Sequence, residues 1–259
     1  MRASRAFGAL LIVAAPIPIV RRYPICNGRT LQTMKSSNAL LSLVSGMALF
    51  SPLGSHSPAI AESTGTDAPH TCVVVAPGNI RSEFGCFRIG VVKNLKFNRS
   101  TVYWHLYSFP SRTAADAARS SSGIVVEENG RVWLSEFGAR NIHVRGGGNV
   151  AVIGPLKLVP ADSYDAEIAY SVMSPSDHSR VHTHSGPEAW YVLTGIQCLE
   201  TPDLTRSAGP GATMTAAANR PMELRVAGTD VARSLTLVIH DSTQEFGTAS
   251  DWKPTGACR

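Results

Sequence analysis

Three side chains with the chemistry of metal ligands lie close together between Ser179 and Gly195. His182 and His184 are separated by one residue, and Glu188 follows after three more. Alternate residues of an extended segment point to the same face, so the two imidazoles project together. The Ser-Gly-Pro sequence at 185–187 predicts a turn that brings the carboxylate back at the start of a second strand. The sequence therefore predicts two imidazoles and one carboxylate at one end of a β-hairpin.

Two histidines and one carboxylate are the ligands of many non-haem iron sites, and zinc uses the same ligand types in catalytic sites. Such sites keep positions open for water or substrate. The alternative is a pair of surface histidines beside a turn, with no metal. We favour a divalent metal, because this ligand set on adjacent strands is seldom assembled without a function. Iron, zinc, manganese, nickel and copper all remain open.

The second strand of the predicted hairpin, Glu188–Thr194, alternates between two faces. Glu188, Trp190 and Val192 share one face. Trp190 is therefore either an aromatic wall beside the ligands or an ordinary core residue, and the sequence leaves both open.

This stretch resembles the first motif of the cupins, a family of small antiparallel β-barrels. The resemblance extends from His182 through His184 and Glu188 to Gly195. It departs from the family upstream, where cupins usually have a glycine six residues before the first histidine and this chain has Ser176. The resemblance implies a cupin-type barrel over the last hundred or so residues, with His182, His184 and Glu188 as metal ligands.

The second cupin motif resembles the stretch Gly209–Met222. Cupins usually place a fourth ligand, a histidine, where this chain has Met222. A thioether is a soft and weak ligand that suits copper better than iron or manganese. Further candidates for an additional ligand or for the pocket are His178, Gln197 and His240. Arg180 and Arg225 are candidates for holding an anionic substrate.

Two functions follow from the resemblance. One is a metal-dependent enzyme of the dioxygenase, isomerase or lyase type that acts on a small molecule. The alternative is a non-catalytic cupin that binds a small ligand without a functional metal. The intact first motif favours the enzyme and the altered second motif favours the binding protein, while the fold alone selects no reaction. The sequence contains no G-x-S-x-G motif, which argues against a serine hydrolase.

The charge of the chain is concentrated at its beginning. The net charge is +5, but the first 61 residues contain six of the 24 lysines and arginines and no acidic residue. The remainder has 18 basic against 19 acidic residues. Without a basic patch in that remainder, we exclude nucleic acid as the main partner. The expected partner is a small molecule.

Residues 1–61 are expected to be a leader. From Met34 onward the sequence has Lys35, the apolar run Ala39–Phe50 and an Ala-Ile-Ala sequence that ends at Ala61. This order predicts a signal peptide that starts at Met34 and is cleaved after Ala61. The twelve residues of the apolar run are too few for a stable membrane span. The mature protein is therefore expected to be secreted or periplasmic.

The cysteines agree with export. Cys26 lies in the leader, and Cys72, Cys86, Cys198 and Cys258 remain in the mature chain. An even number in an exported chain permits disulfides. We favour a Cys72–Cys86 pair, which encloses a short Pro-Gly-containing segment. The pairing of the other two stays open, and four buried thiols are the alternative.

The rest of the mature chain predicts a mainly β protein in two parts. Residues 62–145 form a small α+β unit, with a strand over Thr101–Phe109, a helix over Ser111–Ser121 and an Asn-Gly hairpin at 124–137. We interpret this unit as a packing or dimerising module, so a homodimer is one expectation. Short strands at regular spacing then predict a cupin-type antiparallel barrel, or jelly roll, over residues 146–259. Its tail, Asp241–Arg259, has no periodicity and is expected to wrap the outside.

Overall fold

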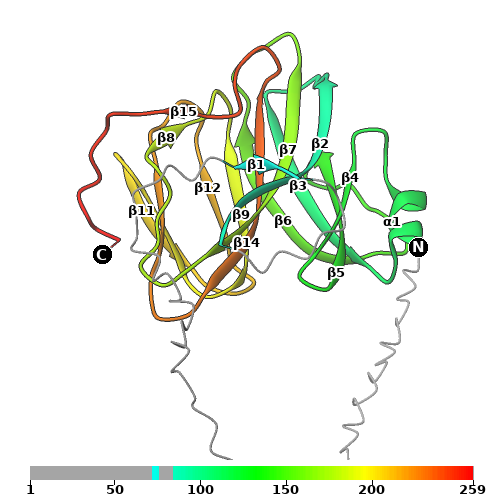
Figure 1. Cartoon of the computed structure of the whole chain (residues 1–259). Coiled ribbons are helices and arrows are strands. Elements are labelled where there is room, and N and C mark those ends of the chain that lie inside the picture. Colours follow the sequence, from blue (N-terminus) through cyan, green and yellow to red (C-terminus); the bar gives the residue numbers. More distant parts are fainter. Residues whose placement is uncertain (1–71, 76–83, 259) are drawn as a thin grey trace, which may run out of the picture. The chain divides into compact units, whose positions relative to one another are not determined.

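A computed structural model describes residues 72–75 and 84–258 of the chain (Figure 1). These residues are mostly β-strand, with one short helix, and belong to one compact unit. The expected leader, with its start at Met34 and its cleavage site, lies outside the described residues. Among the described helices, none has the length and apolar character needed to cross a membrane.

The strands form four sheets. Their orders are β1-β2-β7-β14-β9-β12, β4-β5-β3-β6, β11-β10-β13 and β15-β8. The elements are β1 (Val73–Val74), β2 (Gly85–Leu95), β3 (Thr101–Phe109), α1 (Arg112–Ala118), β4 (Ile124–Glu128), β5 (Arg131–Gly138), β6 (Gly148–Lys157), β7 (Tyr164–Met173), β8 (His182–Thr183), β9 (Glu188–Thr194), β10 (Gln197–Thr201), β11 (Leu204–Ala208), β12 (Thr213–Ala216), β13 (Glu223–Val226), β14 (Ala232–Asp241) and β15 (Thr248–Ala249).

Local sequence explains the elements of the first half. Ser111 caps helix α1, because its side-chain oxygen accepts a hydrogen bond from the backbone N–H of Ala114 at 3.2 Å. Between β4 and β5, Asn129 and Gly130 have φ angles of 53° and 70°. Both lie in the left-handed region that a type I′ turn requires. The capped helix and the Asn-Gly hairpin are thus confirmed.

The six-stranded sheet is covered on both faces. Alternate residues of β7, including Ile168 and Tyr170, pack into a hydrophobic cluster with Trp104 of β3 and Trp133 of β5. A second cluster, around Trp190, lies on the other side and contains residues of β10, β12 and β13. Figure 1 accordingly shows the four-stranded sheet to one side of the six-stranded sheet and β11 to the other.

The structure joins the two parts into which the sequence divided the mature chain near residue 145. Strand β3 pairs with β6, and β2 pairs with β7. Strands on both sides of the expected boundary thus share two sheets and one core. The small α+β unit packs on the barrel of its own chain, because its strands β2 and β3 pair with β7 and β6, which lie beyond residue 145.

The final segment also differs from expectation. Residues after β14 were expected to wrap the outside, but β15 pairs with β8, which includes His182. Residues 245–249 line the main cavity. A strand of only two residues leaves no periodic signal in the sequence. Strand β11 was not predicted either, because four of its five residues are exposed and do not alternate with buried ones.

Candidate metal centre

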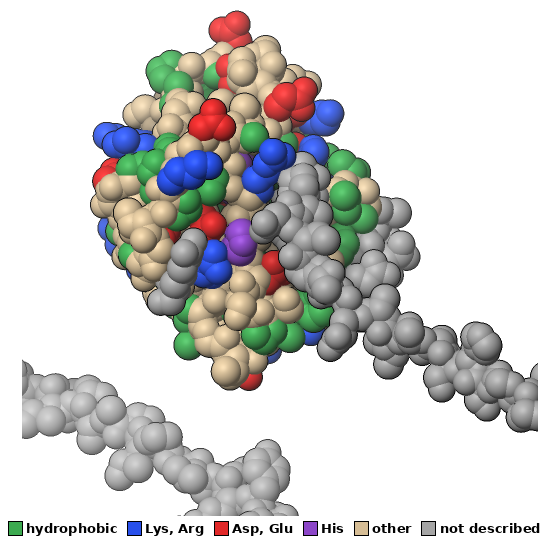
Figure 2. Space-filling model, turned by 60° about the vertical axis from the view of Figure 1, so that its left-hand side comes forward, with side chains coloured by type: hydrophobic (Ala, Val, Ile, Leu, Met, Phe, Trp, Pro, Cys, Tyr) green, Lys and Arg blue, Asp and Glu red, His purple; other side chains and the backbone are tan. Residues whose placement is uncertain are grey.

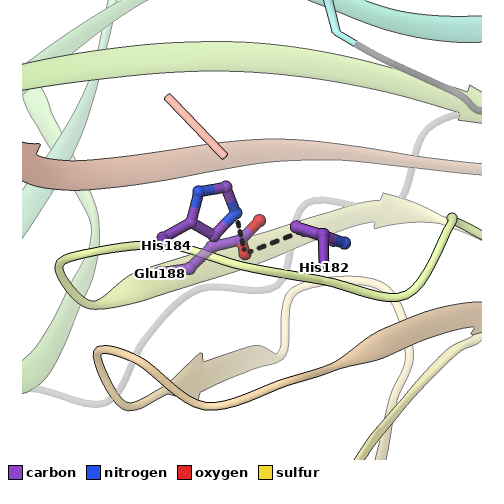
Figure 3. Close-up of side chains that lie close together, drawn as sticks. All are labelled: His182, His184 and Glu188. Atoms are coloured by element: carbon purple, nitrogen blue, oxygen red, sulfur yellow. Dashed lines mark ion pairs between the residues drawn. The ribbon is translucent and has the colours of Figure 1, made fainter. Parts of the chain in front are cut away.

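Strand β8 pairs with β15, and β9 pairs with β14 and β12, so the two strands do not form the predicted hairpin. The three candidate ligands nevertheless converge. His182 lies on β8, His184 directly follows that strand, and Glu188 is the first residue of β9. One ligand atom from each residue lies within 4.8 Å of the other two. Oxygen Oε2 of Glu188 is 2.9 Å from Nε2 of His184 and 3.8 Å from Nε2 of His182 (Figure 3).

The turn between the two strands requires a glycine because it lies against β14. A Cβ atom on Gly186 would stand 1.6 Å from the carbonyl oxygen of Ile239. The backbone of Ile239 donates a hydrogen bond to the carbonyl of Pro187 at 3.2 Å, and Val238 pairs with Glu188 across the strands. The position of the carboxylate is thus fixed by the central strand of the sheet.

Backbone carbonyls orient both imidazoles. Nδ1 of His182 lies 2.7 Å from the carbonyl oxygen of Arg180, and Nδ1 of His184 is hydrogen-bonded to the carbonyl oxygen of Phe246. A carbonyl only accepts, so each Nδ1 must carry the proton. In the neutral ring this leaves the lone pair on Nε2, and both Nε2 atoms face Glu188. Metal-binding histidines usually donate their other ring N–H to a carbonyl or carboxylate oxygen in this way.

These residues fit a metal ion. Nε2 of His184 and Oε2 of Glu188 are buried, and neither has a hydrogen-bond partner elsewhere among the described residues. A lone pair and a carboxylate oxygen 2.9 Å apart repel each other unless a proton or a cation lies between them. A divalent cation would neutralise the carboxylate and use both imidazole lone pairs at once.

Burial and charge oppose each other at this site. Burial alone would raise the pKa of Glu188. When the imidazoles are protonated instead of bound to a metal, the charge of His184 and hydrogen bonds from both histidines lower it to about 2. Burial would likewise lower the pKa of His182, but the hydrogen bond and the charge of Glu188 raise it above its usual value. The carboxylate is thus ionised at neutral pH, as a metal ligand must be.

A cavity of about 270 Å³ opens beside the three ligands and has room for a small molecule. Its walls are largely apolar and include Trp190, Val172 and Leu224. Arg88 and Arg180 add positive charge. The His182 side chain is 24% exposed, and Figure 2 shows histidine atoms at the surface with lysine or arginine side chains beside them.

The structure separates the other candidate pocket residues. Trp190 is buried and lines the cavity, so it belongs to the hydrophobic core and also forms part of the cavity wall. Met222 lies opposite His182 across a backbone bridge, with its side chain buried in the cluster around Trp190. Gln197 is fully buried, and its Nε2 donates to the sulfur of Met173 at 3.7 Å. Neither Met222 nor Gln197 lines the cavity.

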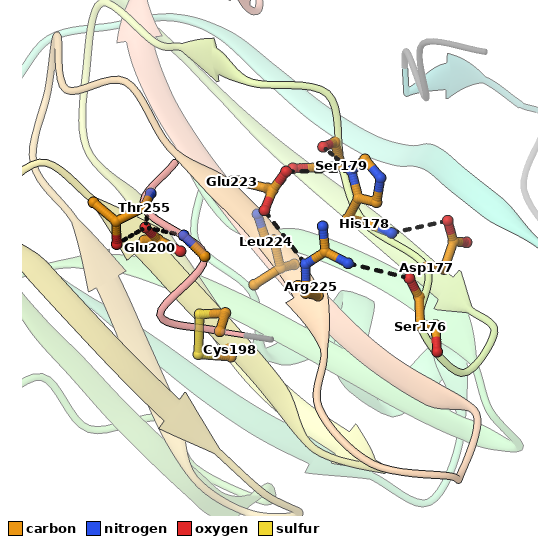
Figure 4. A network of polar contacts seen from close by, with 12 residues as sticks. Ser176, Asp177, His178, Ser179, Cys198, Glu200, Glu223, Leu224, Arg225 and Thr255 are labelled. Carbon is orange, nitrogen blue, oxygen red and sulfur yellow. Dashed lines mark hydrogen bonds and ion pairs between the residues drawn. A yellow bond between two sulfur atoms is a disulfide. The ribbon is translucent and has the colours of Figure 1, made fainter. Parts of the chain in front are cut away.

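His178 and Arg225 belong to a different polar cluster (Figure 4). Nδ1 of His178 is 3.3 Å from a carboxylate oxygen of Glu223, and Nε of Arg225 is 3.4 Å from the other. Arg225 also donates to the carbonyl oxygen of Ser176. The group of three ligands does not include His178. Of the two arginines considered for an anionic substrate, Arg180 alone reaches the cavity.

His240 is drawn into an ion-pair network that the sequence did not predict. Its Nε2 lies 3.2 Å from Glu167, and the same carboxylate accepts hydrogen bonds of 2.5 and 2.7 Å from Arg88. The Arg88 guanidinium stacks on the ring of Phe246 at 4.9 Å. His240 therefore supports the cavity wall and does not replace the missing ligand. The sequence did not identify Arg88 and Phe246 as residues of this site, because the residues that they contact are remote in sequence.

Two disulfides are present. Cys72 pairs with Cys86, the pair that the sequence favoured, and both residues line the cavity. Cys198 pairs with Cys258, which the sequence left open. Two disulfides are compatible with an extracellular location.

No family model matches the chain, and no curated protein matches it either. Solved structures that resemble it include cupin superfamily proteins. One, a cupin superfamily protein from Desulfitobacterium hafniense, is 13% identical over 29% of this chain and 68% of its own, with a TM-score of 0.28. A cupin 2 conserved barrel domain protein from Salinispora arenicola is 18% identical over 30% of this chain and 65% of its own, with a TM-score of 0.28.

The similar structures also include enzymes. The DMSP lyase DddQ from Ruegeria pomeroyi is 16% identical, with a TM-score of 0.30, over 33% of this chain and 43% of its own. Because these overlays cover about a third of the chain at low scores, the barrel description rests on the strand order and the sequence motif. The convergence of His182, His184 and Glu188 is likewise a property of this chain's own geometry.

Proposed function

We propose that this is an exported metal-dependent protein that binds one divalent cation through His182, His184 and Glu188 and acts on a small molecule in the adjoining cavity. The observation that carries the proposal is the convergence of two Nε2 atoms and one ionised carboxylate, within 4.8 Å, on the wall of that cavity. When bound, such a cation can polarise a carbonyl group or activate water.

The surrounding residues support this use of the cavity. Carbonyls of Arg180 and Phe246 hold the imidazoles in the tautomer that a cation needs. Apolar walls at Trp190 and Leu224 exclude water from the bound molecule. Arg180 is the candidate partner for a negatively charged group of the substrate, since Arg88 is already paired with Glu167.

A second candidate function is non-catalytic binding of a small ligand. Met222, opposite His182, supports it, because a thioether replaces the fourth ligand that the family usually supplies. Catalytic sites with three protein ligands are nonetheless common. The two functions differ in whether a bound small molecule leaves the cavity chemically changed.

Elemental analysis of the mature chain, purified without a histidine tag or chelator, tests the proposal. We expect a single metal ion per chain in the parent protein and none in the H182A/H184A variant. The H143A/H178A variant removes the same number of imidazoles outside the group of three ligands and should keep the metal. Absence of metal from the parent, after soaking with iron, zinc, manganese, nickel and copper, would contradict metal binding. Turnover of small carboxylic acids by the loaded protein, followed by NMR, would separate the enzyme from the binding protein.

A further inference from the structure

The chain crosses the cavity once more after its last long strand. Residues 242–258, here called the C-terminal strap, leave β14 and pass over the candidate metal centre. Residues 245–249 of the strap line the cavity. Among its residues only Cys258 is buried, so the strap contributes little to the hydrophobic core.

The strap contacts one of the candidate ligands directly. The carbonyl of Phe246 accepts the hydrogen bond that orients His184, and the two rings meet edge to face at 5.1 Å. At the next residue, a Cβ atom on Gly247 would stand 3.1 Å from Cε1 of the same imidazole. The strap backbone thus lies against His184, and a glycine permits this approach.

The middle of the strap is held to residues 181–183 by backbone hydrogen bonds. Thr248 and Ala249 pair with Thr183 and His182 in the two-stranded sheet β15-β8. The N–H of Ser250 donates to the carbonyl oxygen of Val181 at 3.1 Å. A two-residue pairing with exposed side chains is weak, because isolated short ladders are marginal in water.

Stronger restraints lie at the far end. The disulfide between Cys198 and Cys258 ties the strap to β10. One carboxylate oxygen of Glu200 accepts three hydrogen bonds, from the N–H and hydroxyl of Thr255 and from the N–H of Gly256. Glu200 and the disulfide are both visible in Figure 4. The strap is therefore anchored at both ends and only lightly held where it crosses the cavity.

We propose that the C-terminal strap is a tethered lid, in which the Phe246 carbonyl positions His184 for the metal and the Cys198–Cys258 disulfide keeps the lid in place. The metal part of this inference rests on the proposed function. Segments with few buried apolar contacts open more readily than the core. The Cys198–Cys258 disulfide opposes this opening, because it restricts the conformations that the strap can adopt away from the cavity. The strap thus controls both access to the cavity and the orientation of one ligand.

The C198S/C258S variant tests the tether. Loss of a partner that orients a metal-binding histidine typically costs about 10- to 100-fold in metal affinity, and we expect a loss in this range. Metal affinity is measured by competition with a chromophoric chelator, at a temperature where circular dichroism shows the variant folded. An unchanged affinity would overturn the proposal.

A second measurement needs no metal. Diethyl pyrocarbonate modifies accessible imidazoles, and mass spectrometry locates the modified residue. His184 is 2% exposed in the closed structure and should react slowly in the parent and severalfold faster in C198S/C258S. Exposed His143 serves as the internal control and should react equally in both. Equal rates at His184 would overturn the lid, whereas failure of the parent to bind any metal would overturn only the proposed function.

If the double variant does not fold, G247A tests the same contact. The added methyl would press on His184 and should weaken metal binding and speed modification of His184. G209A is the matched control, because a Cβ atom there would meet nothing within 4 Å. If G247A and G209A had the same metal affinity and the same rate of His184 modification, the proposed role of the strap in positioning His184 would be contradicted.

Discussion

The two faces of the six-stranded sheet serve different purposes. On the face toward the four-stranded sheet, Ile168 and Leu237 pack into the hydrophobic cluster around Trp104. On the opposite face the same strands present Glu167 and Thr236, near the ligand Glu188. All ten residues of β7 are buried, so both faces are covered. One face is thus packed by apolar side chains against a second sheet, whereas the other combines the apolar cluster around Trp190 with buried polar groups.

This division also gives the first half of the chain a role. Strands β3 to β6 and helix α1 include none of the candidate metal ligands. They cover the apolar face, which would otherwise be exposed to water. Gly90 of β2 shows how close this contact is, since a Cβ atom there would stand 2.5 Å from Ile124 of β4. The packing module expected from the sequence thus packs within its own chain.

The largest effect on stability is expected from the apolar face. Leu237 is fully buried, so L237A should lower the free energy of unfolding by about 2–5 kcal/mol. Its neighbour Thr236 faces the cavity, and T236A should cost less, because it removes less apolar surface. Urea denaturation measures both. Metal affinity should stay unchanged in L237A, and a loss of metal there with a stable T236A would contradict the division of the two faces.

A smaller effect is expected where the turn at 185–187 meets β14. In G186A the new methyl would collide with the backbone of Ile239, which cannot rotate away as a side chain can. Overpacking of this kind costs about 1–3 kcal/mol of stability. Metal affinity should fall as well, because the turn sets the distance between His184 and Glu188. G209A again serves as the control, and a G186A variant with parental metal affinity would show that the turn tolerates movement.

An effect of similar size, but dependent on pH, is expected from the ion pair beside the cavity. Burial would raise the pKa of Glu167, but hydrogen bonds from His240 and Arg88 lower it. Burial would lower the pKa of His240, but Glu167, assisted by the Asp241 carbonyl and by Asp165, raises it. The Glu167 contribution is present above its ordinary pKa of 4.5 and is lost as pH falls. The His240 contribution is present below 6.5 and is lost as pH rises through the raised value.

The H240Q variant tests how much the ion pair between His240 and Glu167 contributes to stability. Between pH 4.5 and 6.5, where both contributions are present, we expect a loss of stability. A buried hydrogen bond to a charged group suggests a loss of about 1–3 kcal/mol. The difference from the parent should shrink as pH rises through the raised pKa of His240, because the imidazole then becomes neutral in the folded parent as well. Urea denaturation of parent and variant across this pH range provides the test. If the difference in their free energies of unfolding did not change with pH, the ion pair would be contradicted.

Much of the candidate metal centre was predictable because its determinants are local. Because His182 and His184 are two residues apart, an extended segment places them on one face. The turn sequence at 185–187 predicts that the chain then reverses and brings Glu188 close to them. The Asn-Gly hairpin and the capped helix followed from short-range chemistry in the same way. The division near residue 145 could not be judged from the sequence, since strand pairing over long distances leaves no local pattern. β6 pairs with β3 from almost fifty residues away.

The sequence by itself determined that His182, His184 and Glu188 come together across a turn, the alternation of β9 and the favoured Cys72–Cys86 pair. Each depends on residues within about fifteen positions of one another. Only the tertiary structure decided that Arg88, Glu167 and His240 meet, that Met222 is buried opposite His182, and that the C-terminal strap crosses the cavity. The physical reason is that these contacts join remote segments, whose meeting is set by strand order and by covering of both sheet faces.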